Sequence, residues 1–479
     1  MITNVTATAL AALTAAAYFS GLTLPLMGPD EPRYAQVARE MLERGDWITP
    51  TLGGSLWFEK PALLYWLETI AYHVFGVNEL AARIGPALFG IGTIFCLFLL
   101  GRSLGRGKLF AALAASTVGL IAFSHGASFD IILTLPITAT LVAYYLHQNA
   151  KSPRLFLVTA YFFLGVGLLA KGLVGLIFPA AIVFFYHLAS WKRPTRAAFE
   201  SMLWGGAVTL AAAAVWYLPM YLQHGYYFID QFFIQHHFQR FTSNKYQHPQ
   251  PFIFFFWMLP VLALPWAPLA LGELWKLFRG LLRHHTDTQD ADHDLAVFAA
   301  VWLLVPLFFF SFSGSKLPGY ILPAVPAAVV LAALFLVRSD VPGRLRKLVP
   351  AAAVLTLLTS VLIILFYLPG FAAADSVRSA IAAASAAGYG DAPVLGLHTV
   401  SHNAEFYAPG RLVRLPDGRQ RRFLGAAEVK EFIVLHNAGK PVLVIVPREY
   451  LASLQSFEGL RTQVIGETAE DVLVAASVN

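Results

Sequence analysis

The feature that most constrains this chain is a series of apolar runs, each about twenty residues long, which is enough to cross a bilayer core about 30 Å thick. These runs recur through the first three quarters of the 479 residues. Charged residues make up only 13% of the chain, against about 25% in soluble domains, so a soluble fold of this size would lack the charge to solvate its surface. The sequence therefore predicts an integral membrane protein built from α-helical spans.

Sliding-window hydropathy predicts about eleven spans. They lie near residues 5–27, 80–101, 108–124, 130–148, 155–170, 173–190, 202–222, 251–274, 294–312, 317–337 and 348–368. No basic residue precedes the first run and a motif-rich segment follows it at once, so we interpret this run as a retained helix and not as a cleaved signal peptide.

The basic residues indicate which way the chain crosses the membrane. When the loops are assigned alternately to two sides, one side collects most of the Lys and Arg, in the loops near residues 102–108, 151–154, 192–196, 276–283 and 338–347. Positive loops face the cytoplasm, which places the N-terminus inside and the C-terminus outside. The net charge of +6 is thus a topology signal and does not indicate a nucleic-acid groove.

The composition changes after about residue 370. Short β-type runs such as 394–397, 442–446 and 472–475 alternate with helical stretches, a pattern typical of a small α/β domain. We therefore expect a transmembrane catalytic domain over residues 1–370, with outer loops at 28–79 and 223–250. An α/β domain outside the membrane would follow over residues 371–479.

Three acidic residues fall on the predicted outer side. Asp30 and Glu31 follow the first span and open a predicted amphipathic helix, and Asp130 opens the fourth span. Asp30 and Asp130 could each be only a helix N-cap. Acidic side chains at membrane depth are costly, however, and usually serve a function. A carboxylate near the outer leaflet could accept a proton from an incoming hydroxyl.

Three lysines share that side. Lys60 precedes Pro61, Lys171 ends the fifth span, and Lys316 precedes Pro318. A proline in the first helical turn would place Lys60 and Lys316 beside free backbone N–H groups, an environment that suits a phosphate. The alternative for each lysine is a side chain that snorkels to the interface. Three on one side favour a phosphate-bearing lipid.

The segment 232–241 mixes aromatic residues with His236, His237 and Arg240. Arg240 could bind a phosphate through two hydrogen bonds. The histidines could be hydrogen-bond donors, metal ligands or interfacial residues. Their spacing fits no standard zinc motif, so no metal site is assigned.

Several of these segments together resemble a known family. Asp30-Glu31-Pro32-Arg33-Tyr34, Phe58-Glu59-Lys60-Pro61, Ala170-Lys171-Gly172, the His236…Arg240-Phe241 segment and Ser315-Lys316-Leu317-Pro318-Gly319-Tyr320 occur in the same order in family 39 glycosyltransferases of the GT-C superfamily. The likeness is to bacterial lipid A aminoarabinose transferases, and more distantly to protein O-mannosyltransferases. It covers roughly residues 25–330.

The resemblance implies an enzyme that takes a sugar from a polyprenyl (undecaprenyl) phosphate carrier at the outer face of a bacterial inner membrane. It makes Asp30 the catalytic carboxylate, with Asp130 and Glu31 as further acids of the site. The implied substrate contacts are Arg33, Glu59, Lys60, Lys171, His236, Arg240, Lys316 and Tyr320. Glu59 and His236 could support each other or a divalent cation. Gln235 stands where many relatives have an acid, and this difference weakens the assignment of an acid-base or metal-binding role to this segment.

The expected acceptor is lipid A or another envelope lipid or glycan. Two alternatives stay open, a protein O-glycosyltransferase of the same superfamily and a polyprenyl-lipid transporter or flippase. The flippase is disfavoured because the candidate residues gather at one face and not at the bilayer midplane, and because the sequence shows no inverted repeat.

Overall fold

The computed structural model describes residues 4–239, 250–282, 291–338 and 341–478. Contacts divide the chain into two compact units. The first unit comprises residues 1–20, 58–64 and 83–362, and the second comprises residues 21–57, 65–82 and 363–479.

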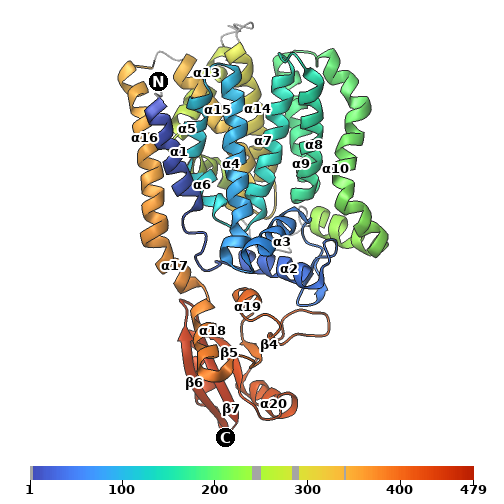
Figure 1. Cartoon of the computed structure of the whole chain (residues 1–479), viewed down its shortest axis with the longest axis vertical. Coiled ribbons are helices and arrows are strands. Elements are labelled where there is room, and N and C mark those ends of the chain that lie inside the picture. The colour runs from blue at the N-terminus through green and yellow to red at the C-terminus, as the bar shows by residue number, and fades with distance from the viewer. Residues whose placement is uncertain (1–3, 240–249, 283–290, 339–340, 479) are drawn as a thin grey trace. The chain divides into compact units, whose positions relative to one another are not determined.

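The first unit is a helical bundle (Figure 1). Its elements are α1 (Asn4–Phe19), α4 (Glu79–Ser103), α5 (Gly107–Ala115), α6 (Val118–Ser124), α7 (Phe129–His147), α8 (Pro153–Lys171), α9 (Val174–Ser190), α10 (Arg196–Ile229), η1 (Asp230–Gln239), α12 (Phe254–Leu262), α13 (Ala267–Leu282), α14 (Ala291–Ser311), η2 (Pro318–Ala324), α15 (Val325–Arg338) and α16 (Gly343–Leu362). The first four residues of α4 belong to the second unit.

Within the described residues, seven helical segments are long and apolar enough to cross a membrane, and the bent pair α5–α6 would make an eighth. The helices α1 and α9 are apolar but shorter. Helix α7 and the η2–α15 segment are the most deeply buried of the candidates, as expected for helices that are apolar on all sides. The chain thus has the architecture of a polytopic helical membrane protein, as predicted.

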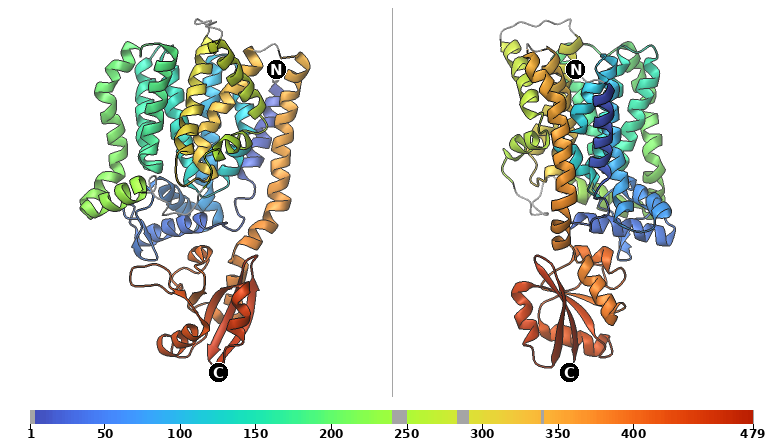
Figure 2. Two further views of the ribbon diagram at one scale, coloured as in Figure 1. Left: turned by 180° about the vertical axis from the view of Figure 1, so that it is seen from behind. Right: turned by 60° about the vertical axis from the view of Figure 1, so that its left-hand side comes forward.

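The packing order follows the chain over much of the bundle. Helices α7, α8 and α9 contact one another, α10 packs on α8, and α14 packs on both α9 and α15 (Figure 1). The start of α1, the end of α13 and the start of α16 lie at one end of the bundle, whereas α7 and α9 begin at the opposite end (Figures 1 and 2). This arrangement agrees with the alternating assignment of loops to two sides.

The span at residues 107–124 is broken between α5 and α6, which meet at an angle of 61°. A neighbouring segment supplies hydrogen bonds at the break. The backbone N–H of Val118 donates to the carbonyl of Leu264 (2.9 Å), and the indole of Trp266 donates to the hydroxyl of Ser116 (3.2 Å). Backbone groups freed inside a membrane are tolerated only when other protein groups bind them in this way.

The second unit combines two helices of the predicted outer loop with the C-terminal segment. Its elements are α2 (Asp30–Arg44), β1 (Thr51–Leu52), β2 (Ser55–Leu56), α3 (Leu63–Phe75), η3 (Ile363–Tyr367), α17 (Leu368–Asp375), α18 (Arg378–Ala384), η4 (Ser385–Tyr389), β3 (Val394–Leu397), α19 (His402–Tyr407), β4 (Arg422–Phe423), α20 (Ala426–His436), β5 (Val442–Pro447), η5 (Arg448–Tyr450), α21 (Leu451–Gln455), β6 (Leu460–Glu467) and β7 (Asp471–Val478).

The described strands of the C-terminal segment form a five-stranded sheet with the order β4-β3-β5-β7-β6. Strand β3 runs parallel to β4 and β5, and β7 runs antiparallel to β5 and β6. Side chains alternate between the two faces. Val442, Val444 and Val446 pack with α20 and α21, whereas Leu443 and Ile445 pack with α18 and α19 (Figure 2).

Helix α2 packs on α19 of the same unit. The guanidinium of Arg39 donates to the carbonyl of Phe406 (2.8 Å) and lies 4.2 Å from the centre of its ring. The hydroxyl of Tyr407 accepts from the backbone N–H of Leu26 (2.7 Å) and donates to Glu79 (3.1 Å). These contacts join the chain just before α2 to the C-terminal segment.

Candidate active site

The acid pair predicted from the sequence opens α2. Asp30 is the first residue of α2, its carboxylate forms an ion pair with Arg33, and its side chain is 45% exposed. The residue before it, Pro29, makes no side-chain capping bond. Glu31 is buried, with 7% exposure, and accepts from the backbone N–H of Met27 (2.8 Å). Two neighbouring carboxylates thus have different environments, one open and one enclosed.

Arg33 orients Asp30 from the next turn of the helix. Its Nε donates to the carbonyl of Pro29 (2.9 Å), and its guanidinium lies 5.8 Å from the centre of the Trp57 ring. Because these contacts hold the guanidinium in place, Arg33 fixes the carboxylate of Asp30 while leaving it open to solvent.

The C-terminal segment holds the turn that leads into α2. The backbone N–H of Gly28 donates to the carboxylate of Asp375 (2.7 Å), and the side chain of Asn403 donates to the carbonyl of Gly28 (3.4 Å). The sequence offered no signal for these residues, because they lie some 350 positions from Gly28.

A second cluster lies in the first unit. Lys171, the last residue of α8, forms an ion pair with Asp130 in the first turn of α7. Its ammonium also lies 4.9 Å from the centre of the Tyr320 ring, in η2. A Cβ atom on Gly319 would collide with the carboxylate of Asp130 and with Phe123, so this position requires glycine. Three of the predicted residues are therefore neighbours, from three different helices.

Lys316 is buried, and its ammonium donates to the carbonyls of Gln250 (3.0 Å) and Ser313 (2.6 Å). Burial lowers its pKa from the usual lysine value. Backbone carbonyls thus take up two of its N–H groups, and a phosphate could use the third.

Glu59 and Lys60 lie in a short segment of the first unit, and both are partly exposed. Phe58 anchors this segment, with its ring 5.0 Å from that of His224 and 5.7 Å from that of Phe228. Helix α3 begins at Leu63, so Pro61 precedes the helix and does not occupy its first turn as predicted. Lys60 therefore lies a few residues ahead of the free N–H groups.

Two of the predicted residues cannot be placed. Arg240 and the side chain of His236 lie outside the described residues. Within the described part of the chain, no group of three His, Cys, Asp or Glu side chains could hold a metal ion. The suggested pairing of Glu59 with His236 around a divalent cation thus stays a prediction.

One buried acid, Glu68, was not among the residues predicted from the sequence. It lies on α3, whose buried face contacts α2 through bonds from Thr69 and Tyr72 to the carbonyls of Ala38 and Ala35. Glu68 is 1% exposed, and among the described residues neither of its carboxyl oxygens has a hydrogen-bond partner. Burial raises its pKa well above the usual range, and the nearby Glu31 raises it further. A lone acid in an otherwise apolar helical stretch was the available signal.

Comparison with known proteins shows which family the chain resembles. Residues 6–236 match the family model described as dolichyl-phosphate-mannose-protein mannosyltransferase. The chain is 34% identical over 324 residues to an undecaprenyl phosphate-alpha-4-amino-4-deoxy-L-arabinose arabinosyl transferase of Pseudomonas aeruginosa strain LESB58, an alignment that covers 65% of this chain and 55% of that protein. These matches support the predicted resemblance to family 39 of the GT-C superfamily. The chain spans little more than half the length of these relatives.

Solved structures agree with the family 39 fold. The crystal structure of ArnT from Cupriavidus metallidurans bound to undecaprenyl phosphate superposes with a TM-score of 0.78 at 22% identity, covering 98% of this chain and 97% of that one. The archaeal oligosaccharyltransferase AglB from Archaeoglobus fulgidus gives a TM-score of 0.56 at 12% identity, with coverages of 93% and 69%. At these identities the likeness establishes the GT-C fold alone.

Proposed function

We propose that this chain is a membrane glycosyltransferase that moves a sugar from a polyprenyl phosphate carrier to an acceptor of the cell envelope, such as lipid A, another lipid or a glycan. The observation that carries the proposal is the 34% identity to a protein named as an undecaprenyl phosphate-aminoarabinose transferase. The open carboxylate of Asp30 at the start of α2 provides a group suited to the chemistry.

In the proposed reaction, the acceptor hydroxyl attacks the anomeric carbon as the bond to the phosphate oxygen breaks. Asp30 takes the hydroxyl proton, and the carrier leaves as polyprenyl phosphate. The transition state has oxocarbenium character, as in glycoside hydrolysis. A single displacement forms no covalent enzyme intermediate, so we expect inversion at the anomeric carbon.

Negative charge builds on the leaving phosphate, so fixed cations stabilise the transition state more than the ground state. We propose that Lys60 and Lys316 supply this charge, together with Arg240. Lys171 has a different role in this scheme, since its ammonium is already paired with Asp130 beside Tyr320. That cluster would hold α7, α8 and η2 together and would not bind the phosphate directly.

We further infer about eleven membrane spans, which are the seven long segments, the bent α5–α6 pair, the shorter apolar helices α1 and α9, and the α12–α13 segment. The positive-inside bias supports a cytoplasmic N-terminus. On that orientation, residues 371–479 form an α/β domain on the periplasmic side, and the sugar is transferred there.

A protein acceptor is the second candidate. The match of residues 6–236 to the family model favours a protein acceptor, because the description of that family names a protein as the acceptor of mannose. The proposed chemistry at Asp30 is the same for both acceptors, so only the identity of the product separates them.

Mass spectrometry of envelope lipids, glycans and proteins tests the proposal. The strains to compare are a deletion strain, the complemented strain and a strain carrying Asp30→Asn. Loss of one sugar from the same acceptor in both the deletion and the variant would support transfer and would identify the acceptor. Unchanged profiles, with the protein expressed and the sugar-linked carrier present, would contradict transfer and favour a flippase.

A further inference from the structure

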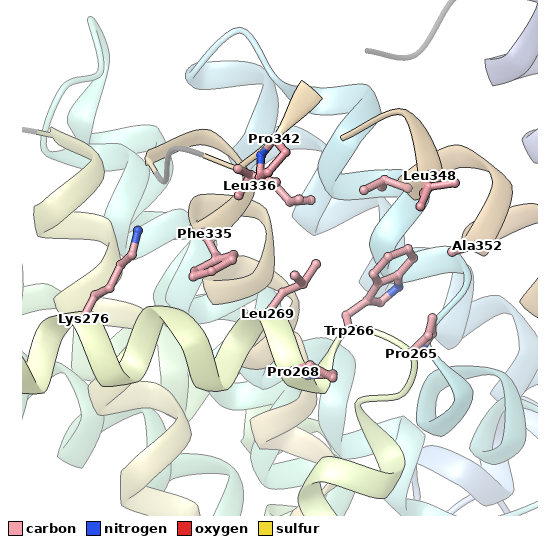
Figure 3. Close-up of a pocket in the computed structure, with 12 residues that line it drawn as sticks. Pro265, Trp266, Pro268, Leu269, Lys276, Phe335, Leu336, Pro342, Leu348 and Ala352 are labelled. Atoms are coloured by element: carbon pink, nitrogen blue, oxygen red, sulfur yellow. The ribbon is translucent and has the colours of Figure 1, made fainter. Parts of the chain in front are cut away.

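An apolar groove lies in the first unit between α13, α15 and α16, and none of the candidate active-site residues lines it (Figure 3). Its volume is about 530 Å³. Trp266 and Leu269 form one wall, Phe335 and Leu336 form another, and Leu348 and Ala352 of α16 complete it. Prolines add further carbon surface, which makes the groove suited to hydrocarbon.

The one polar group on the large aromatic wall is already bound. Trp266 donates its indole N–H to the hydroxyl of Ser116 (3.2 Å), so its ring presents carbon to the groove. Leu348, at the rim, is 58% exposed. A lipid chain could therefore enter from the surrounding bilayer and contact an uninterrupted apolar lining.

The length of the groove fits one leaflet. Trp266 and Lys276 both line it, and the helix between them rises about 15 Å over ten residues. That distance is half of a hydrocarbon core about 30 Å thick. The groove is therefore long enough to hold an acyl chain that spans one leaflet.

Basic residues lie at the groove and beside it. The ammonium of Lys276 lies 4.9 Å from the centre of the Phe335 ring, at one end of the groove (Figure 3). Helix α16 begins beside the lining residue Pro342, and its first turn carries Arg344, Arg346 and Lys347. The acid on this part of α13, Glu273, is buried and paired with Arg338 (2.6 Å), and it also attracts Lys276 electrostatically. The sequence analysis assigned this end to the cytoplasm, where anionic lipids bind basic sites between helices.

We infer that this groove binds an anionic phospholipid such as phosphatidylglycerol. One acyl chain lies against Trp266 and Leu269, and the phosphate is held by Lys276 and the basic first turn of α16. The site is independent of the proposed transferase chemistry. It would brace α16 against α13 and α15.

Native mass spectrometry of the full chain in mild detergent tests the inference. The probes are dioleoyl phosphatidylglycerol and dioleoyl phosphatidylcholine, which share their acyl chains. We expect one phosphatidylglycerol to bind at least about fivefold more tightly than phosphatidylcholine, because one basic residue near an anionic headgroup has an effect of this size. Equal affinity for the two lipids would overturn the inference.

Variants separate the groove from general surface charge. Lys276→Gln should lower the affinity for phosphatidylglycerol about fivefold. Arg196→Gln removes an equally basic, exposed residue from the start of α10 and should have no effect. Leu269→Trp should block the acyl chain, with Ala352→Leu as a milder variant if the first fails to fold. Unchanged lipid binding in a folded groove-filling variant would contradict the inference.

Discussion

Lys171, at the end of α8, forms an ion pair with Asp130, in the first turn of α7. The two side chains are only 19% and 17% exposed, so the pair is largely shielded from water. An ion pair of this kind between helices fixes their relative position at the end of the bundle where η2 also begins.

Breaking that pair from one side should destabilise the protein more than removing both charges. Lys171→Met leaves the carboxylate of Asp130 without its partner, and a partly buried lone charge is costly. Combining it with Asp130→Asn should restore part of the loss, with a coupling of about 0.5–3 kcal/mol. Thermal unfolding of Lys171→Met, Asp130→Asn and the double variant in detergent measures this coupling. Strictly additive losses would contradict the pairing.

Gly319→Ala should disturb the same pair. The added Cβ would collide with the carboxylate of Asp130 and with Phe123, and overpacking costs about 1–3 kcal/mol. Gly206→Ala in α10 is the matched control, since no atom lies within 4 Å of its added Cβ. We expect a lower unfolding temperature for the first variant and no loss for the second. Equal behaviour of the two would show that Gly319 has free space beside it.

Glu68→Gln should stabilise the protein at neutral and alkaline pH. The folded-state pKa of Glu68 is raised, so its stabilising contribution is complete below the unfolded-state pKa, about 4.3, and is lost as the pH rises. The loss is at most about 1.4 kcal/mol per pH unit. Gln stays neutral and avoids it.

Unfolding temperatures of the wild type and Glu68→Gln should therefore be similar at about pH 4.5 and diverge toward pH 8, with the variant higher. Glu43→Gln, an exposed change on α2, should show no such divergence. A constant difference between wild type and Glu68→Gln at all pH values would mean that Glu68 is ionised in the folded protein.

Tyr407→Phe should loosen the chain before α2. The hydroxyl of Tyr407 accepts from the backbone N–H of Leu26 (2.7 Å), and its loss leaves that amide unbound. Hydrogen exchange at the amides of residues 26–31 should become faster. Tyr367→Phe, an exposed tyrosine on η3, should leave the exchange unchanged. Equal protection in Tyr407→Phe would remove this contact as an anchor of the Asp30 segment.

Hydropathy and charge were sufficient to predict the helical class and the approximate spans, because apolar length and basic loops report directly on the bilayer. The family motifs also brought Asp130, Lys171 and Tyr320 into one candidate set. Their contact depends on three helices meeting, and spacing along the chain carries no information on that.

Contacts between segments that are distant in sequence could be found only in the folded structure. The contacts of Gly28 with Asp375 and of Arg39 with Phe406 join segments that are hundreds of residues apart, and hydropathy cannot report them. The burial of Glu68 was not predicted, because a single acid in an apolar helix usually lies at a surface. Pro61 suggested a helix start at Lys60, whereas α3 begins at Leu63.

In the proposed mechanism, Asp30 catalyses transfer from a polyprenyl phosphate sugar. The most direct measurement is the release of free polyprenyl phosphate by the purified full chain in nanodiscs. The reaction would contain envelope lipid extracted from the deletion strain, in which the sugar-linked carrier and the unmodified acceptor remain. We predict release by the wild type and by Glu43→Gln, and at least a hundredfold slower release by Asp30→Asn, as for loss of a general base (about 10²–10⁴-fold). Release by a folded Asp30→Asn protein at the wild-type rate would contradict the account.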